Sequence, residues 1–230
     1  LEQPINILVQ RRAAIGDVIM ATGVVRELKR LYGATAEIAV ATDNIHVFKN
    51  NPHISFICSP DEDLSGFDVV YNLDDAYETN PENHYVDSYF YRVFGHLDFD
   101  RSVELWPTAE ERAGVDKWVQ ALDEQFIVVH MRNWHWALKN IELDVWCDIF
   151  AQVFEQRSDV KVVCIGGPTD LYLDHPLFVD ARAKYTPQQL AYFLNSARCF
   201  VGIDSGPFQI PGASNTHVIG LLTHNPPRNI

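Results

Sequence analysis

The chain has 230 residues, of which 47% are hydrophobic and 21% are charged. These proportions are ordinary for a globular α/β protein with a sizeable core. The formal net charge of −13 argues against general nucleic-acid binding, which needs a broad cationic surface to release phosphate counterions. No apolar run approaches the roughly 20 residues of a spanning helix, and the amino terminus lacks a secretory signal pattern. We therefore expect a cytoplasmic protein.

The cysteine and histidine residues predict no structural metal and no disulfide framework. The four cysteines form no C-x-x-C pair, and Cys58, Cys164 and Cys199 lie in apolar runs, where buried free thiols are usual. The histidines show no repeated metal-ligand spacing. We predict neither a metal nor a cofactor.

The first thirty residues predict a strand, a loop and a helix. An apolar run at 5–9 has the length of a strand, and apolar residues then recur every three or four positions from Val18 to Tyr32, the helical period. Asp17 occupies a position typical of an N-cap, and Gly33 a position typical of a C-terminal stop. In a doubly wound sheet this loop lies where ligands bind. Asp17 is therefore either an ordinary helix cap or a residue that faces a ligand.

The rest of the chain alternates strand and helix patterns, the signature of parallel sheets. In the first half the pattern predicts strands at 37–41, 54–58 and 68–73, a short helix at 44–50 and a helix with an aromatic core stripe at 85–97. A polar loop at 74–83 is a candidate contact for a substrate, because such loops lie over the functional edge of a sheet. In the second half it predicts a helix opened by the capping box at Thr108, strands at 126–129, 160–165, 199–203 and 218–222, and helices at 145–154 and 186–197. We therefore predict two Rossmann-like domains, 1–105 and 106–230, facing a cleft.

The stretch A-I-G-D-V-I-M-A-T-G-V-V-R-E-L-K-R at 14–30 resembles the opening of glycosyltransferase family 9, the ADP-heptose:lipopolysaccharide heptosyltransferases. In the second half, His130, Lys139 and Trp146 stand in the order and spacing that this family shows. The resemblance implies a GT-B fold and a metal-independent, inverting transfer of a heptose-like sugar. It also implies that Asp17 is the catalytic base.

The resemblance further implies a donor site in the second half. Lys139 takes the role of the lysine that binds the donor diphosphate, whose charge grows as the glycosidic bond breaks. Arg132 and Asn133 add hydrogen-bond donors, and Asp170, after a Gly-Gly-Pro turn, takes the role of the carboxylate that holds the ribose. By residue type alone, Lys139 is equally well a solvated loop lysine, and Asp170 a helix cap.

The stretch from Asp204 through Ser205 and Gly206 to Gln209 also resembles a family motif. Backbone amides at the start of the following helix can face a phosphate or sugar hydroxyls. Gln209 stands where many family members have His. The Gln side chain can donate and accept hydrogen bonds but cannot become cationic.

The substrates implied by the resemblance are an ADP-sugar and a saccharide acceptor such as lipopolysaccharide core. A glycolipid acceptor would bring the protein to the inner membrane surface. Both substrates are anionic, so we expect local basic residues to bind them, with Arg11 and Arg12 on the acceptor side.

Two departures from the family pattern leave other functions open. The chain is shorter than is usual for the family, and its end lacks the family's crossover helices, which indicates either a truncated chain or a compact relative. A non-catalytic nucleotide- or sugar-binding protein and a nucleotide-sugar epimerase are the alternatives. A dehydrogenase is disfavoured because no G-x-G-x-x-G follows a candidate strand.

Overall fold

The computed structural model describes residues 4–122, 125–133 and 135–230. Short 3₁₀ turns occur at Gly33–Thr35, Ile45–Phe48, Ala137–Lys139, Ile210–Ala213 and Pro227–Asn229. The strands and α-helices are, in chain order, β1 (Ile5–Gln10), α1 (Ile15–Tyr32), β2 (Ala36–Ala41), β3 (Phe56–Cys58), β4 (Val69–Asn72), α2 (Tyr85–Phe94), α3 (Ala109–Leu122), β5 (Gln125–His130), α4 (Leu143–Gln156), β6 (Val160–Ile165), β7 (Phe178–Asp180), α5 (Pro187–Leu194), β8 (Phe200–Gly202), α6 (Gly206–Gln209) and β9 (Val218–Gly220).

The chain divides into two compact units, each with its own parallel sheet. The first unit runs to Trp106 and also includes Pro227–Ile230, whereas the second unit is Pro107–Pro226. The last residues join the first unit through hydrogen bonds. The Asn229 side-chain amide donates to the Pro81 carbonyl at 2.7 Å, and Arg228 pairs with Glu82 at 2.9 Å. The sequence predicts residues 106–230 as one domain. No sequence pattern indicates that Pro227–Ile230 belong to the first unit.

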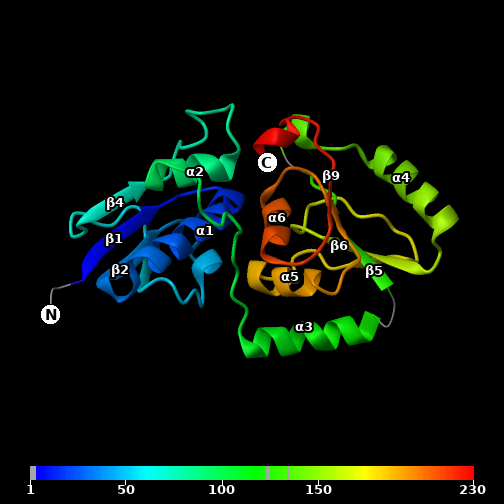
Figure 1. Ribbon diagram of the computed structural model, residues 1–230. Helices are drawn as coiled ribbons and strands as arrows, with labels where there is room; N and C mark the ends of the chain where they lie inside the picture. The colour runs from blue at the N-terminus through cyan, green and yellow to red at the C-terminus, as the bar shows by residue number, and fades with distance from the viewer. Residues whose placement is uncertain (1–3, 123–124, 134) are drawn as a thin grey trace. The chain divides into compact units, whose positions relative to one another are not determined.

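The sheet of the first unit has the strand order β3-β2-β1-β4, with all pairs parallel. Figure 1 shows β1 between β2 and β4. Chain order reverses next to β1, because β2 and β3 lie on one side of it and β4 on the other. This is the topological switch point, where loops leave neighbouring strands in opposite directions. The loops that follow β1 and β4 therefore meet at one edge of the sheet.

Helix α1 starts earlier than its apolar period suggests. Ala14 is the N-cap, and Asp17 is the third residue of the helix. Asp17 is therefore not the N-cap that the sequence predicted. Its carboxylate instead accepts a hydrogen bond from the Ala14 backbone N–H at 2.9 Å. This is one half of a capping box, because alanine has no side-chain acceptor to complete the other half. Gly33 ends the helix with a φ of 56°, as expected.

The sheet of the second unit has the order β7-β6-β5-β8-β9, again entirely parallel. Its switch point lies between β5 and β8, whose register pairs His130 with Gly202. The sequence pattern does not predict the edge strand β7, because its apolar run covers only 177–179, between Pro176 and Asp180. The two parallel sheets, each alternating with helices, confirm the predicted α/β class with two Rossmann-like parts.

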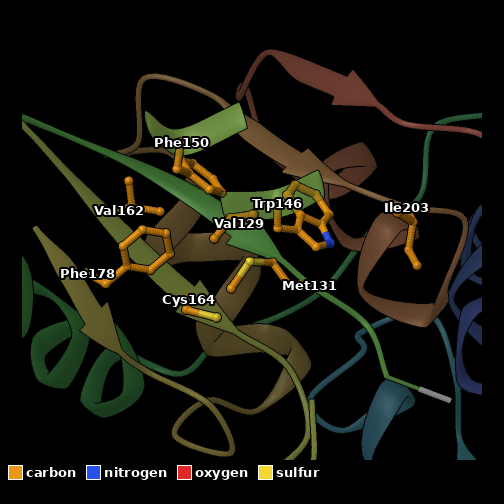
Figure 2. Close-up of a cluster of buried hydrophobic side chains, with 8 residues drawn as sticks. All are labelled: Val129, Met131, Trp146, Phe150, Val162, Cys164, Phe178 and Ile203. Atoms are coloured by element: carbon orange, nitrogen blue, oxygen red, sulfur yellow. The ribbon is translucent and has the colours of Figure 1, made fainter. Parts of the chain in front are cut away.

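Both faces of the second sheet are covered by aromatic packing. On one face, Trp146 and Phe150 of α4 join a buried cluster that also contains Val129, Met131, Val162, Cys164, Phe178 and Ile203 (Figure 2). On the other face, Phe126 stacks on Phe193 of α5 at 5.0 Å between ring centroids. Burial raises the pKa of the Cys164 thiol to about 12, so this cysteine is an inert part of the core. The core holds β5 and β6 rigidly, and with them the loops at their carboxyl ends.

Two capping boxes fix helix starts as the sequence predicted. Thr108 and Glu111 exchange hydrogen bonds at the start of α3, at 2.7 and 3.1 Å. Thr186 and Gln189 do the same at the start of α5. Within the described ranges, no helix combines the length and the apolar character needed to cross a bilayer.

Candidate functional site

The switch point of the first unit brings Asp17 to residues from the loop after β4. Asp17 Oδ2 accepts hydrogen bonds from Arg11 Nη2 at 2.8 Å and from the Ala14 N–H at 2.9 Å. Asp17 Oδ1 accepts one from the Tyr77 hydroxyl at 3.0 Å. The Asp17 side chain remains 16% exposed. The carboxylate is therefore held from three directions while part of it still faces solvent.

Arg11 is the buried cation of this cluster. Its side chain is only 4% exposed, and it pairs with Asp17 and, at 3.1 Å, with Glu78. Its second terminal nitrogen donates to the Leu73 carbonyl at 3.1 Å. The guanidinium also lies 5.4 and 5.6 Å from the ring centroids of Tyr77 and Tyr89. The structure thus directs Arg11 toward Asp17 and away from solvent.

Arg12, the neighbouring predicted acceptor contact, points elsewhere. Its side chain is 41% exposed and pairs with the exposed Asp61. Its backbone N–H donates to Asp74 Oδ1 at 2.9 Å, which fixes the loop after β1 against the loop after β4. Of the two arginines, Arg12 has the more exposed side chain.

In the second unit, His130 ties together the ends of three strands. It is the last residue of β5 and is almost fully buried. Its Nδ1 lies 3.0 Å from Ser205 Oγ, which follows β8, and its Nε2 lies 3.1 Å from Asp170 Oδ2, which follows β6. A carboxylate only accepts hydrogen bonds, so Nε2 donates to Asp170. The Ser205 hydroxyl lies 3.0 Å from both His130 Nδ1 and the Ile203 carbonyl, and its single proton can be donated to only one of them.

Asp170 is held by several donors. Its Oδ2 also accepts from the Gly167 N–H at 2.7 Å, and its Oδ1 accepts from the Asn133 N–H at 2.8 Å. Burial alone would raise the pKa of Asp170, but the hydrogen bonds from His130, Asn133 and Gly167 outweigh burial and hold the pKa below its usual range. Asp170 therefore remains an ionised carboxylate.

The close contact between Asp170 and His130 requires a glycine at position 166, because a larger residue would not fit there. Its φ is +132°, a conformation that side chains disfavour. A Cβ there would lie 2.9 Å from His130 Cδ2 and closer still to the Asp170 carboxylate. The Gly-rich turn noted in the sequence thus lets Asp170 approach His130.

Two cations of the second unit converge on Asp204. Lys139 Nζ forms a close ion pair with Asp204 Oδ2, and both side chains are nearly buried, at 13% and 11% exposed. Arg132 Nη1 donates to the Asp204 carbonyl at 3.1 Å. Burial lowers the pKa of Arg132, and Asp204 and Asp170 offset only part of this effect. Lys139 also lies 4.8 Å from the ring centroid of Trp136.

The other residues that the sequence predicted to bind the sugar donor lie near the carboxyl ends of β5 and β8. The Asn133 side chain donates to the Thr169 carbonyl at 3.3 Å. Ser205 is the N-cap of the short helix α6, which Gly206 begins and Gln209 ends. Asn225, from the segment after β9, donates to Asp204 Oδ2. The structure therefore brings Arg132, Lys139, Asp204 and Ser205 together around the switch point.

Three contact residues were not singled out as site residues by the sequence. They are Tyr77, Glu78 and His130. The sequence marked the polar loop at 74–83 and the strand-end position of His130, but it does not show which of these side chains reach Asp17, Ser205 or Asp170. Among the residues that the structure describes, no group of three or more His, Cys, Asp or Glu is arranged to hold a metal ion.

Comparison with solved structures finds this fold in glycosyltransferases. A glycosyl transferase family 9 structure from Veillonella parvula superposes with a TM-score of 0.73 at 18% identity, covering 96% of this chain and 86% of that one. The E. coli ADP-heptose LPS heptosyltransferase II gives a TM-score of 0.73 at 13% identity, covering 98% and 88%. The E. coli heptosyltransferase WaaC with ADP gives 0.66 at 10% identity, covering 94% and 86%.

Neither a protein-family model nor a curated protein sequence matches the chain. At these identities, the structural likeness establishes the fold that the chain shares with family 9 glycosyltransferases.

Proposed function

We propose that this protein is a metal-independent glycosyltransferase of the family 9 type, which moves a heptose-like sugar from an ADP-sugar to a saccharide acceptor. The observation that carries the proposal is the pair of switch-point sites, one built around an exposed edge of the Asp17 carboxylate and the other around Lys139 and Arg132. The fold shared with heptosyltransferases, one of them named with ADP, supports the choice of donor.

The acceptor side is proposed to be the first unit. Asp17 accepts the proton of the acceptor hydroxyl, and the hydroxyl oxygen then attacks the anomeric carbon of the donor sugar. Arg12, whose side chain is the more exposed of the two arginines, is the proposed contact for anionic groups of the acceptor. Arg11 is engaged by Asp17 and Glu78, so we assign it to the base rather than to the acceptor.

The donor side is proposed to be the second unit. As the anomeric carbon–oxygen bond breaks, its electron pair leaves with ADP, and the diphosphate gains negative charge. Lys139 and Arg132 stabilise that charge from partly buried positions, where an electrostatic interaction is stronger than in water. Asp204, Ser205, Gly206 and Gln209 are the proposed contacts for sugar hydroxyls and phosphate, and Asn133 and Asp170 are the proposed contacts on the ribose side.

The proposed displacement is direct, so the configuration at the anomeric carbon inverts and no covalent intermediate forms. Nothing in this scheme requires a metal ion. The saccharide acceptor is proposed to be of the lipopolysaccharide-core kind, which would bring the protein to the cytoplasmic face of the inner membrane.

The test is a thermal-shift series with ADP, UDP, GDP and their sugar conjugates, followed by mass analysis of acceptor glycosylation. A ligand that binds only the folded state raises the melting temperature with its concentration. We expect ADP and an ADP-sugar to stabilise the protein and the acceptor to gain one sugar. A changed sugar without acceptor would instead indicate an epimerase, and binding without any product would indicate a non-catalytic binding protein.

A further inference from the structure

The hydrogen bonds around Asp17 leave one of its two oxygens more available than the other. An ionised carboxylate offers about four acceptor positions, two on each oxygen. Oδ2 already accepts from the Arg11 guanidinium and from the Ala14 N–H. Oδ1 accepts from the Tyr77 hydroxyl. The position left for a further donor is therefore on Oδ1, the oxygen that Tyr77 contacts.

Tyr77 is itself held firmly in place. Its ring stacks on that of Tyr85 at 4.1 Å between centroids and lies 6.0 Å from that of Tyr89. Burial raises the pKa of Tyr77, and the nearby charge of Asp17 raises it further. The phenol therefore stays protonated throughout the range in which proteins are active. Tyr77 is a hydrogen-bond donor to Asp17 and not a rival base.

We infer that Tyr77 is a positioning residue for the transfer reaction, which turns the Asp17 carboxylate so that the open position on Oδ1 receives the acceptor hydroxyl. This inference rests on the proposed function, in which Asp17 is the base. Arg11 anchors Oδ2 from the opposite side. The acceptor proton moves to Oδ1 while Tyr77 keeps its own proton.

The titratable and charged side chains around Asp17 come from the loops after β1 and β4 and from helix α2. Arg11 follows β1, whereas Asp74 and Glu78 follow β4. Tyr89 comes from α2, where it is fully buried. Among the described residues, the cation that pairs with these carboxylates is Arg11, which lies 3.1 Å from Glu78 and 3.9 Å from Asp74. Of the two side chains that donate to Asp17, Tyr77 is the one whose hydroxyl can be removed without changing the charges of the cluster.

The test is Tyr77→Phe, which removes the hydroxyl and keeps the ring. We expect kcat for transfer to fall about tenfold, because the Asp17 carboxylate is no longer held in its reactive orientation, while KM for the donor stays within about twofold. Tyr91→Phe is the matched control, because Tyr91 lies exposed on α2, and it should change neither quantity.

A double-mutant cycle separates positioning from a general effect on the fold. If Tyr77 acts through Asp17, Tyr77→Phe should change the residual activity of Asp17→Asn by less than about twofold. Equal losses in both backgrounds, or an unchanged kcat for Tyr77→Phe, would overturn the inference while leaving the proposed function standing. Absence of transfer by the wild-type protein would overturn both.

Discussion

The two units place their sites at the same point of the same kind of sheet, yet the balance of charges around the two sites differs. In the first unit, Arg11 is the one cation among Asp17, Glu78 and Asp74. In the second unit, Lys139 and Arg132 both contact Asp204. Topology thus fixes where a site forms, whereas the residues that follow each strand decide its chemistry.

The two ion-pair networks also differ in how they can respond to a ligand. The guanidinium of Arg11 is enclosed by three carboxylates, a carbonyl and two aromatic rings. It can hold Asp17 but has little surface to offer. Lys139 is held chiefly by the Asp204 carboxylate and lies near Trp136. A diphosphate can compete for this lysine because it presents the same kind of anionic oxygen.

The largest expected effect comes from Asp17→Asn, which breaks the first site and leaves the second intact. The amide cannot accept the acceptor proton, so transfer should fall about a hundredfold or more while ADP affinity stays unchanged. Arg11 loses a charged partner and keeps Glu78, so the free energy of unfolding should fall by about 2 kcal/mol. Activity assays, calorimetry and urea unfolding measure the three quantities.

The matched control for this variant is Asp144→Asn, since Asp144 is also an acidic residue in the first turn of a helix but lies exposed on α4. It should leave transfer unchanged. If Asp17→Asn transfers sugar at the wild-type rate, the base must be sought at Asp74 or Asp75.

Lys139→Ala should weaken the second site and leave the first untouched. Loss of a charge-assisted contact should reduce ADP affinity by about ten- to a hundredfold, with little change in adenosine affinity. Calorimetry with both ligands measures the difference, and Lys117→Ala on the exposed surface of α3 is the control. Equal losses for adenosine and ADP would assign Lys139 a structural role.

Asp204→Asn should sharpen the contrast between the sites, because it removes the anion that occupies Lys139. We expect ADP to bind about three- to tenfold more tightly, because the Asp204 carboxylate no longer competes with the diphosphate for Lys139. An ADP-sugar should gain less, because Asp204 is also a proposed contact for its sugar hydroxyls. A loss of ADP affinity would mean that Asp204 supports the lysine rather than competing for it.

The smallest expected effect concerns acid stability of the second unit. The pKa of Asp170 lies below its usual value of 3.8 because its hydrogen bonds outweigh its burial. A carboxyl with a lowered pKa stabilises the fold above its unfolded-state pKa, and this contribution is lost as pH falls through the folded-state value. The wild-type melting temperature should therefore drop as pH falls below about 4.

Asp170→Asn should flatten that acidic drop, since the amide does not titrate. At neutral pH the variant should lose about 2 to 3 kcal/mol of stability, because the amide nitrogen cannot accept the hydrogen bonds that the second carboxylate oxygen received. Thermal melts of both proteins from pH 3 to pH 7 make the comparison. Parallel pH curves would show that the drop arises from other carboxyls.

Local sequence patterns predicted most elements and several of their ends. The apolar period placed α1 and β1, and the Thr108 and Thr186 boxes placed two helix starts, because these features depend on residues at most four positions apart. The same kind of pattern placed Asp17 in the loop region after β1. It misjudged the helix position of Asp17, since Ala14 caps the helix without a side chain that a sequence could reveal.

Tertiary structure alone decided which side chains meet. Tyr77 contacts Asp17 across 60 residues, and Ser205 contacts His130 across 75. Neither pairing has a local signature, because each follows from the strand order that puts β4 beside β1 and β8 beside β5. Strand order depends on how whole helices and strands pack over a core, and residue spacing within a short segment does not encode it. The sequence by itself thus determined the elements and the candidate residues, and packing of the sheets determined their partners.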